Sequence, residues 1–328
     1  MSEKRSLEDI FLSTFHNKFK FSEFLNLSID DEYEKFEIKG RTIYSPSAKL
    51  KVFHRFINSC VFEYSVFNKN VVFSYRKGVT IRDAVEKHST SKYFFQTDIK
   101  SFFSNITTKN IEKTLTEQLI NIPVSDINNY LDLLVNYCVV DNHLPAGFST
   151  SPILSNLCLY KFDNELENHA KMMQLQYTRY SDDIIVSSTN IDALHNITGR
   201  IEILLKQHIN NNIKLNQDKT KTLKKGQRIK LLGLVILPNG MITVDKKHKK
   251  EIETLFYLYL ANQNMFEDYV SKHFHYKNTQ QKSLKELGVS TLSGKLIAMN
   301  SMDNDYINKL RKKYGNTIVE MFLRKSVK

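Results

Sequence analysis

Three aspartates in two segments have the residue type and setting of a metal-dependent phosphoryl-transfer site. Asp182 and Asp183 are adjacent, and β-forming residues lie on both sides of them. This pattern predicts a hairpin with the two carboxylates at its tip. Asp98 closes a second apolar and aromatic run. Hard cations prefer carboxylate oxygens, so three converging carboxylates would hold two Mg2+ ions roughly 3.5–4 Å apart, with Mn2+ as a substitute.

The Asp-Asp pair has a simpler alternative interpretation. Asp favours turns because its side chain forms hydrogen bonds to nearby backbone groups. Taken alone, Asp182 and Asp183 would therefore mark only a polar hairpin turn. The choice between turn and metal site depends on the surrounding sequence.

The surrounding residues form an ordered set of motifs. Tyr-Ser precedes Asp182, a pair of phenylalanines follows Asp98, and a Pro-Ala-Gly loop at 145–147 opens a predicted helix. In this order the motifs resemble those of reverse transcriptases over roughly residues 40–315. The chain is most similar to compact bacterial members of that family, the retron-type and defence-associated enzymes.

Composition and charge agree with a nucleic-acid partner. The 328 residues carry a formal net charge of +12, with a pI near 9.3. Residues 214–250 hold many Lys and Arg and only two acids, which predicts either a solvated face or a track for a polyanion. Three dispersed cysteines in apolar sequence indicate buried thiols in a reducing compartment. No signal peptide or long apolar run is present, so we expect a cytoplasmic protein without a membrane partner.

The resemblance implies an α+β fold with the right-hand architecture of polymerases. An N-terminal helical segment would cover 1–39 and fingers 40–97. The palm, an antiparallel sheet backed by helices, would cover 98–244 with a finger insertion at about 106–140. A short helical thumb would follow at 245–328.

The resemblance also assigns nucleotide-binding residues. Arg76 and Lys77 lie in the segment that contacts the incoming triphosphate in the family. Phe103, five residues after Asp98, would lie beneath the sugar and exclude a 2′-hydroxyl. Ala146 and Gly147 occupy the loop that positions template and nucleotide, although Ala146 stands where many relatives have Gln. Either backbone groups suffice there, or substrate handling differs.

Two further residues are candidates around the metals. Lys219 matches a family lysine, and a cation near the leaving pyrophosphate stabilises developing charge or donates a proton. The backbone carbonyl of Ile99 is a candidate further metal ligand. A surface lysine is the alternative interpretation of Lys219.

The C-terminal part supplies candidates for holding nucleic acid. Leu232, Gly233 and Leu234 resemble the primer grip, within a segment that predicts a hairpin turned at 238–240. Lys246, Lys247, Lys249 and Lys250 fall in the first turns of a predicted helix after Asp245, where cations oppose the helix dipole, so a bound phosphate backbone explains them better than folding does. The closing stretch is similar to the thumb of the compact bacterial enzymes, and the resemblance implies that Lys295, Arg311 and Lys312 track the duplex there.

The resemblance implies an RNA-directed DNA polymerase that uses dNTPs, a structured noncoding RNA template and a DNA product. Antiphage defence is the favoured setting, with a protein effector or a second copy of the chain as further partners. The alternatives are a retron enzyme making RNA-linked DNA, synthesis without a template, and a catalytically silent RNA-binding module.

Overall fold

The computed structural model describes residues 4–38, 40–274 and 283–327, which divide into two compact units. The first unit contains residues 1–78 and 92–222, and the second contains 79–91 and 223–328. The predicted fingers, palm and thumb boundaries stay predictions, and the boundaries at residues 39 and 328 lie outside the described residues. Among those residues no helix is both long enough and apolar enough to cross a bilayer.

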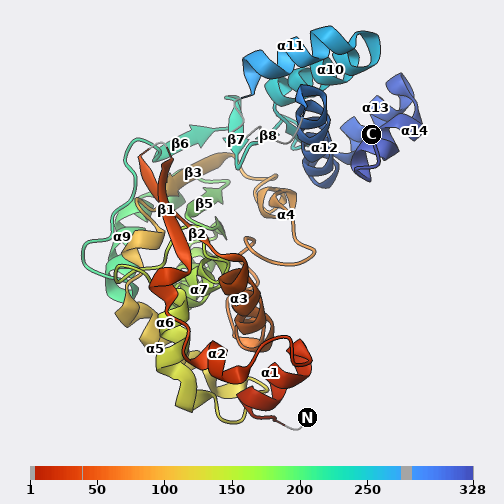
Figure 1. Cartoon of the computed structure of the whole chain (residues 1–328). Coiled ribbons are helices and arrows are strands. Elements are labelled where there is room, and N and C mark those ends of the chain that lie inside the picture. The colour runs from red at the N-terminus through yellow and green to blue at the C-terminus, as the bar shows by residue number, and fades with distance from the viewer. Residues whose placement is uncertain (1–3, 39, 275–282, 328) are drawn as a thin grey trace. The chain divides into compact units, whose positions relative to one another are not determined.

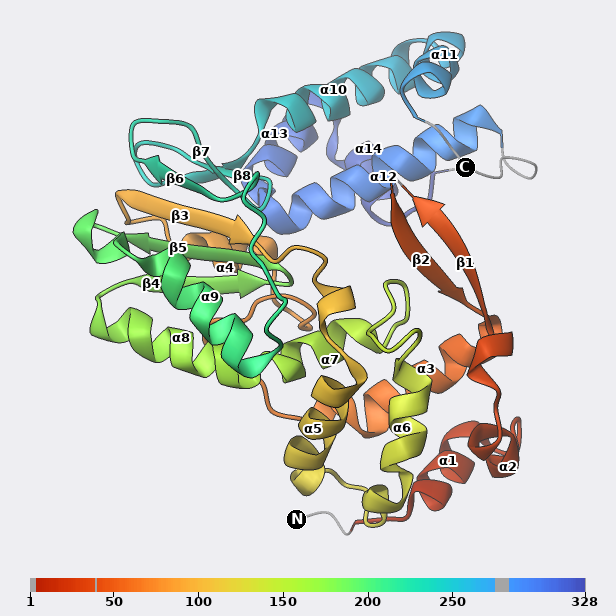
Figure 2. The same cartoon turned by 90° about the vertical axis from the view of Figure 1, so that its left-hand side faces the viewer.

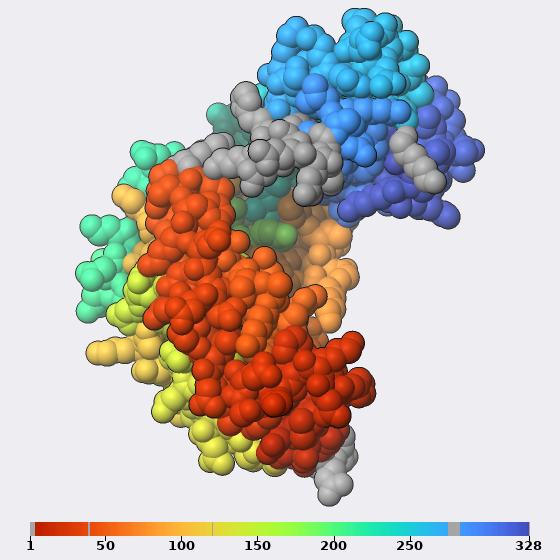
Figure 3. Space-filling view, viewed as in Figure 1, coloured from red at the N-terminus to blue at the C-terminus, as the bar shows by residue number. Residues whose placement is uncertain are grey.

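The N-terminal part of the first unit is a set of helices and one hairpin (Figure 1). In the space-filling view its red and orange residues form a continuous face of this unit (Figure 3). The elements are α1 (Leu7–Phe15), α2 (Phe21–Leu25), β1 (Tyr33–Ile38), β2 (Arg41–Pro46) and α3 (Ala48–Cys60).

Phenylalanines anchor the N-terminal helices. The Phe11 ring lies 5.3 Å from Phe24 and 5.3 Å from Phe56, and Phe24 stacks on Tyr137 at 4.9 Å. All four rings are buried. Aromatic side chains bury large apolar areas, so this cluster attaches the N-terminal helices to the body of the unit.

The centre of the first unit is a sheet with the strand order β4-β5-β3-β6. Strands β3 and β4 each pair with β5 in antiparallel register. Both faces of β5 are covered, since every residue of it after Asp183 is buried. The strands are β3 (Tyr93–Asp98), β4 (Gln176–Tyr180), β5 (Asp183–Ser188) and β6 (Lys221–Lys224).

Helices surround this sheet, and α8 packs against both β4 and α9 (Figure 2). The helices of this part of the unit lie against the sheet or between the sheet and the N-terminal cluster. They are α5 (Thr108–Gln118), α6 (Leu131–Cys138), α7 (Ser151–Cys158), α8 (Tyr160–Met172) and α9 (Ile197–His208). Together with the sheet they give the mixed helix and antiparallel-sheet fold that the sequence predicts.

The second unit combines a small sheet with packed helices (Figure 1). Strands β7, β8 and β9 form an antiparallel meander. The elements are α4 (Ile81–Glu86), β7 (Ile229–Leu231), β8 (Leu234–Ile236), β9 (Ile242–Val244), α10 (Lys246–Ala261), α11 (Gln263–His273), α12 (Leu284–Met302), α13 (Asn304–Tyr314) and α14 (Asn316–Leu323).

Close packing of α11 on α12 yields a prediction about two glycines of α12. A Cβ at Gly288 would lie 2.6 Å from the Phe266 ring and 2.7 Å from Val270, both fully buried, whereas Gly294 has open space around it. We expect Gly288→Ala to destabilise the second unit by about 1–3 kcal/mol through overpacking. The matched Gly294→Ala should stabilise it by about 0.5–1 kcal/mol, because Ala favours helix over Gly. Hydrogen exchange of the α12 amides measures both, and equal effects of the two variants would contradict the packing.

Candidate active site

The strand register of the first unit brings the three aspartates together. Asp98 ends β3 and faces Asp183, the first residue of β5. Tyr180 pairs with Asp183, so Ser181 and Asp182 form a two-residue turn between β4 and β5. The amide of Ile99 donates a hydrogen bond to the Asp182 carbonyl at 3.1 Å, which fixes the turn against the end of β3.

The electrostatics of the site agree with closely spaced carboxylates. Burial, followed by the charges of Asp182 and Asp98, raises the pKa of Asp183 to about 6. Like charges that share a partly buried site repel, so the protonated form is favoured until a cation neutralises them. The arrangement has the character of a cation site lined by oxygen.

Lys219 reaches this site from the loop before β6. Its ammonium forms an ion pair with the second carboxylate oxygen of Asp98. The pKa of Lys219 is raised first by that hydrogen bond, with further contributions from the charges of Asp98, Asp182 and Asp183. The loop is held in place because the Asn216 amide donates to the Asp98 carbonyl at 2.9 Å.

The donor set fits a divalent cation. Within the described residues, Oδ1 of Asp98 is buried and has no hydrogen-bond partner, so it is free to coordinate an ion. Among the same residues no group of three or more His, Cys, Asp or Glu side chains is placed so that it could hold a metal ion without rearrangement. Lys219 occupies the other oxygen of Asp98, so an ion that used both oxygens of this carboxylate would displace the ammonium.

A buried salt bridge holds the backbone of the turn at Ser181 and Asp182. Arg179 is fully buried, and it donates to the two Asp163 carboxylate oxygens at 2.8 and 2.6 Å. Its third nitrogen donates to the Ser181 carbonyl at 2.9 Å and to the Asn156 amide oxygen at 3.2 Å. Burial alone would lower the pKa of Arg179, but Asp163 raises it above its usual value.

Sequence reasoning did not find this buried network. The available signal was an Arg in the middle of an apolar strand, since charged side chains are almost never fully buried unless they are paired. The partner Asp163 lies 16 residues earlier, on α8, and nothing in the local pattern indicates the contact.

The predicted nucleotide-binding cations make local contacts. Arg76 donates to the carbonyls of Lys69 at 2.7 Å and Val72 at 2.6 Å, and its guanidinium lies 5.8 Å from the Phe73 ring. Lys77 pairs with Glu63 at 2.8 Å, although its side chain is largely exposed. Their role towards a triphosphate stays a prediction.

The two phenylalanines after Asp98 differ in exposure. Phe102 is buried, and Phe103 is only partly buried and packs 5.2 Å from it. Phe103 begins a short 3-10 helix, Phe103–Asn105. Phe102 therefore belongs to the core, and Phe103 stays the candidate sugar gate.

The loop of Ala146 and Gly147 is packed against β2. The Tyr44 amide donates to the Ala146 carbonyl at 2.8 Å. Gly147 has a φ of +117°, and a Cβ there would lie 2.2 Å from the Tyr44 carbonyl oxygen. Gly147 is therefore required for backbone packing, independently of any nucleotide.

The predicted primer-grip residues form a tight turn in the second unit. Leu232 and Gly233, with φ of 50° and 87°, connect β7 to β8, and Leu234 is fully buried. The sequence predicted a single hairpin turned at 238–240. The structure adds this second turn at 232–233, because Leu is an unusual residue at positive φ and gave no turn signal.

The predicted nucleic-acid cations of the second unit fall into two groups. Three form ion pairs: Lys249 with Asp303 at 2.7 Å, Lys295 with Glu251 at 3.1 Å, and Arg311 with Glu320 at 2.7 Å. The other four are exposed to solvent. They are Lys246, Lys247, Lys250 and Lys312.

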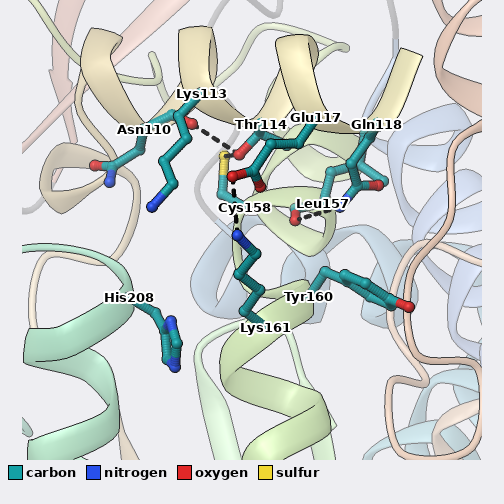
Figure 4. A pocket seen from close by; sticks show the side chains of 10 residues that line it. All are labelled: Asn110, Lys113, Thr114, Glu117, Gln118, Leu157, Cys158, Tyr160, Lys161 and His208. Atoms are coloured by element: carbon teal, nitrogen blue, oxygen red, sulfur yellow. Dashed lines mark hydrogen bonds and ion pairs between the residues drawn. The ribbon is translucent and has the colours of Figure 1, made fainter. Parts of the chain in front are cut away.

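A polar pocket of the first unit is lined by residues of α5, α7, α8 and α9 (Figure 4). Lys161 pairs with Glu117 at 2.8 Å across it, and the Thr114 hydroxyl donates to the Cys158 sulfur at 3.4 Å. None of the predicted site residues lines this pocket, so it is not the reaction site. The lining residues are Asn110, Lys113, Thr114, Glu117, Gln118, Leu157, Cys158, Tyr160, Lys161 and His208.

Comparison with curated proteins finds bacterial relatives of similar length. Retron Ec83 reverse transcriptase of Escherichia coli is 23% identical over 301 residues, covering 88% of both chains. Retron Ec73 reverse transcriptase of Escherichia coli is 27% identical over 287 residues, covering 85% of this chain and 84% of the relative.

Among solved structures, apo telomerase from Candida tropicalis matches with a TM-score of 0.50 and 10% sequence identity. The match covers 87% of this chain and 58% of the telomerase chain. At this identity the likeness concerns the fold alone, and it agrees with the polymerase fold predicted from the sequence.

The family model for reverse transcriptase (RNA-dependent DNA polymerase) matches residues 34–236. This segment includes β3, β4 and β5, and with them the three converging aspartates. The chain therefore belongs to the reverse transcriptase family and is an RNA-directed DNA polymerase of the retron-type bacterial group.

Proposed function

We propose that this polymerase transfers nucleotides through Asp98, Asp182 and Asp183, with two Mg2+ ions held between these carboxylates. The observation that carries the proposal is the register of β3 and β5, which sets Asp98 opposite Asp183 beside the Asp182 turn. The Ile99 carbonyl is a candidate further ligand. Bound Mg2+ would activate the primer 3′-hydroxyl and neutralise charge on the departing pyrophosphate.

The residues around the carboxylates prepare the site for this chemistry. The buried Arg179 fixes the turn backbone, so the carboxylates keep their positions when cations bind. Lys219 supplies a mobile positive charge beside Asp98 and would release it towards the phosphates as the site fills. Phe103 would exclude a 2′-hydroxyl from the sugar of the incoming nucleotide. The same nucleotide would be bound by Arg76, Lys77, Ala146 and Gly147.

Surfaces of the second unit would hold template and product. Leu232, Gly233 and Leu234 would act as the primer grip, and the exposed lysines of α10 would contact the phosphate backbone. The proposed partners are a structured noncoding RNA, the DNA product and dNTPs, in the cytoplasm.

The names of the relatives favour a retron setting, in which RNA-linked DNA is made. Antiphage defence, through a protein effector or self-association, is the wider setting that we propose for that product.

The aspartate assignment predicts the result of primer extension. On an RNA template with Mg2+, Asp182→Ala and Asp183→Ala should each lower the rate by roughly a hundredfold or more, because metal ions supply several kcal/mol of transition-state stabilisation. Asp192→Asn, which changes an exposed acid of the same unit, is the control and should retain the wild-type rate. Undiminished synthesis by both site variants would refute the assignment. Undiminished RNA binding without synthesis by the wild type would support a silent binding module.

The partly exposed ring of Phe103 predicts sugar selectivity. Phe103→Ala should open space for a 2′-hydroxyl and reduce the preference for dNTPs over ribonucleotides by roughly tenfold or more. Steady-state incorporation of matched dNTP and rNTP substrates gives the ratio. The control is Phe102→Ala, which removes a buried ring and should lower stability without changing the ratio. An unchanged ratio in Phe103→Ala would remove the sugar-gate proposal.

The raised pKa of Asp183 predicts a pH dependence of metal-free stability. Asp183 has a pKa of about 6 when folded, against about 4 in an unfolded chain. The folded state therefore binds more protons between these values, and stability falls as pH rises through about 6. In EDTA at pH 8, Asp183→Asn should raise the unfolding temperature by a few degrees, and the difference should vanish below about pH 4.

Mg2+ reverses this dependence because it competes with the proton for the carboxylate. Mg2+ should stabilise the wild type at pH 8 and much less at pH 5.5. Thermal unfolding with Mg2+ or EDTA measures both effects, and a stabilisation by Mg2+ that does not change with pH would contradict this coupling.

A further inference from the structure

Tyr75 reaches the catalytic turn from a distant part of the sequence. Its hydroxyl lies 2.8 Å from the Ser181 hydroxyl, across a sequence separation of 106 residues. The segment before it pairs with β4: the Arg179 amide donates to the Val71 carbonyl at 2.8 Å, and the Phe73 amide donates to the Arg179 carbonyl at 3.0 Å. This pairing places the residues after Phe73 beside the turn.

Tyr75 differs from the two cations that follow it. Arg76 is held by carbonyls of its own loop, and Lys77 pairs with Glu63. Among these three residues, Tyr75 alone has a described contact with the catalytic turn. Tyr75 is 42% exposed, but partial burial of its hydroxyl still raises its pKa, so the hydroxyl keeps its proton at neutral pH and can donate to Ser181.

Both ends of this hydrogen bond have left-handed backbone. Tyr75 has a φ of 58° and Ser181 a φ of 59°. Left-handed conformations are unfavourable for residues with a side chain, and they persist where neighbouring contacts hold them. Ser181 is also held from the opposite side, because Arg179 donates to its carbonyl.

We propose that Tyr75 is a positioning residue for the catalytic turn, acting through its hydroxyl on Ser181 to keep Asp182 oriented for metal binding. The inference rests on the proposed function, since it assigns a role towards the metals to a residue that does not touch them. Asp182 follows Ser181 directly, so the direction of its carboxylate depends on the Ser181 backbone. Loss of the hydrogen bond would remove one of the two contacts that hold Ser181 and would widen the range of directions that the Asp182 carboxylate takes.

The loop of Tyr75 thereby becomes coupled to the metals. Residues 76 and 77 are the candidate triphosphate contacts, and Tyr75 precedes them directly. A movement of this loop on nucleotide binding would be transmitted through one hydroxyl to the turn that carries Asp182. Arg179, which is paired with Asp163, also donates to the Ser181 carbonyl and so limits how far the turn can move.

A double-mutant cycle of Tyr75→Phe and Ser181→Ala tests the contact itself. Each single change removes one hydroxyl and leaves the carbon atoms of the side chain in place. Thermal unfolding of the metal-free protein should show that the double variant is no less stable than the worse single variant, because both changes remove the same bond. Tyr64→Phe removes the hydroxyl of an exposed tyrosine in the same unit and should have no effect.

Calorimetric Mg2+ titration and primer extension then test the positioning role. One hydrogen bond corresponds to about a fivefold change in an equilibrium, so Tyr75→Phe should bind Mg2+ about fivefold more weakly. At limiting Mg2+ its kcat should fall by a similar factor, and saturating Mg2+ should restore most of it, with KM for dNTP unchanged. The unchanged KM would distinguish this loss of metal affinity from a loss of nucleotide contact.

The outcomes separate this inference from the proposed function. Independent, additive effects in the cycle, or wild-type Mg2+ affinity in Tyr75→Phe, would overturn the positioning role even where Asp182→Ala abolishes synthesis. A raised KM for dNTP at unchanged Mg2+ affinity would also overturn it and assign Tyr75 to direct nucleotide contact. Retained synthesis by Asp182→Ala would instead remove the proposed function on which the inference rests.

Discussion

The pairing of β3 with β5 is the constraint on which the site depends. It fixes Asp98 opposite Asp183, and the two-residue turn then leaves Asp182 next to both. A shift of one residue in this register would turn the side chains of β3 to the other face of the sheet and separate the carboxylates. The register is enforced by burial, because β5 is covered on both faces and β3 contributes buried residues on both.

Holding three acids together costs stability, and the surrounding structure compensates locally. The raised pKa of Asp183 expresses the repulsion, and the Lys219 ammonium relieves part of it. The buried pair of Arg179 and Asp163 has another role. The two charges neutralise each other, and Arg179 donates a hydrogen bond to the Ser181 carbonyl. Buried ion pairs add little net stability against an apolar replacement, but breaking one by removing a partner is strongly destabilising. We infer that this pair serves to fix the backbone of the turn at Ser181 rather than to add net stability.

The sequence predicted what is local and periodic. The hairpin around Asp182 and the helices of the C-terminal part follow from short-range patterns that the structure retains. It did not predict the long-range partners: Asp163 for Arg179, Ser181 for Tyr75, or Tyr44 for Gly147. Each of these contacts depends on how distant elements pack, and a single sequence carries no local signal for that. The turn at Leu232 was missed for another reason: Leu232 has a positive φ, which leucine rarely adopts, so its residue type gave no turn signal.

The distribution of basic residues shows why net charge alone overstates a binding surface. Of the seven cations predicted to hold nucleic acid in the second unit, Lys249, Lys295 and Arg311 are paired with acids. Such pairs reduce the field available to a phosphate, and exposed pairs also contribute little to stability. Lys246, Lys247 and Lys250, on the first turns of α10, retain their exposure where the helix dipole disfavours them. These three lysines and Lys312 on α13 are the predicted cations of this unit that stay exposed, so the proposed contact with a phosphate backbone rests on them.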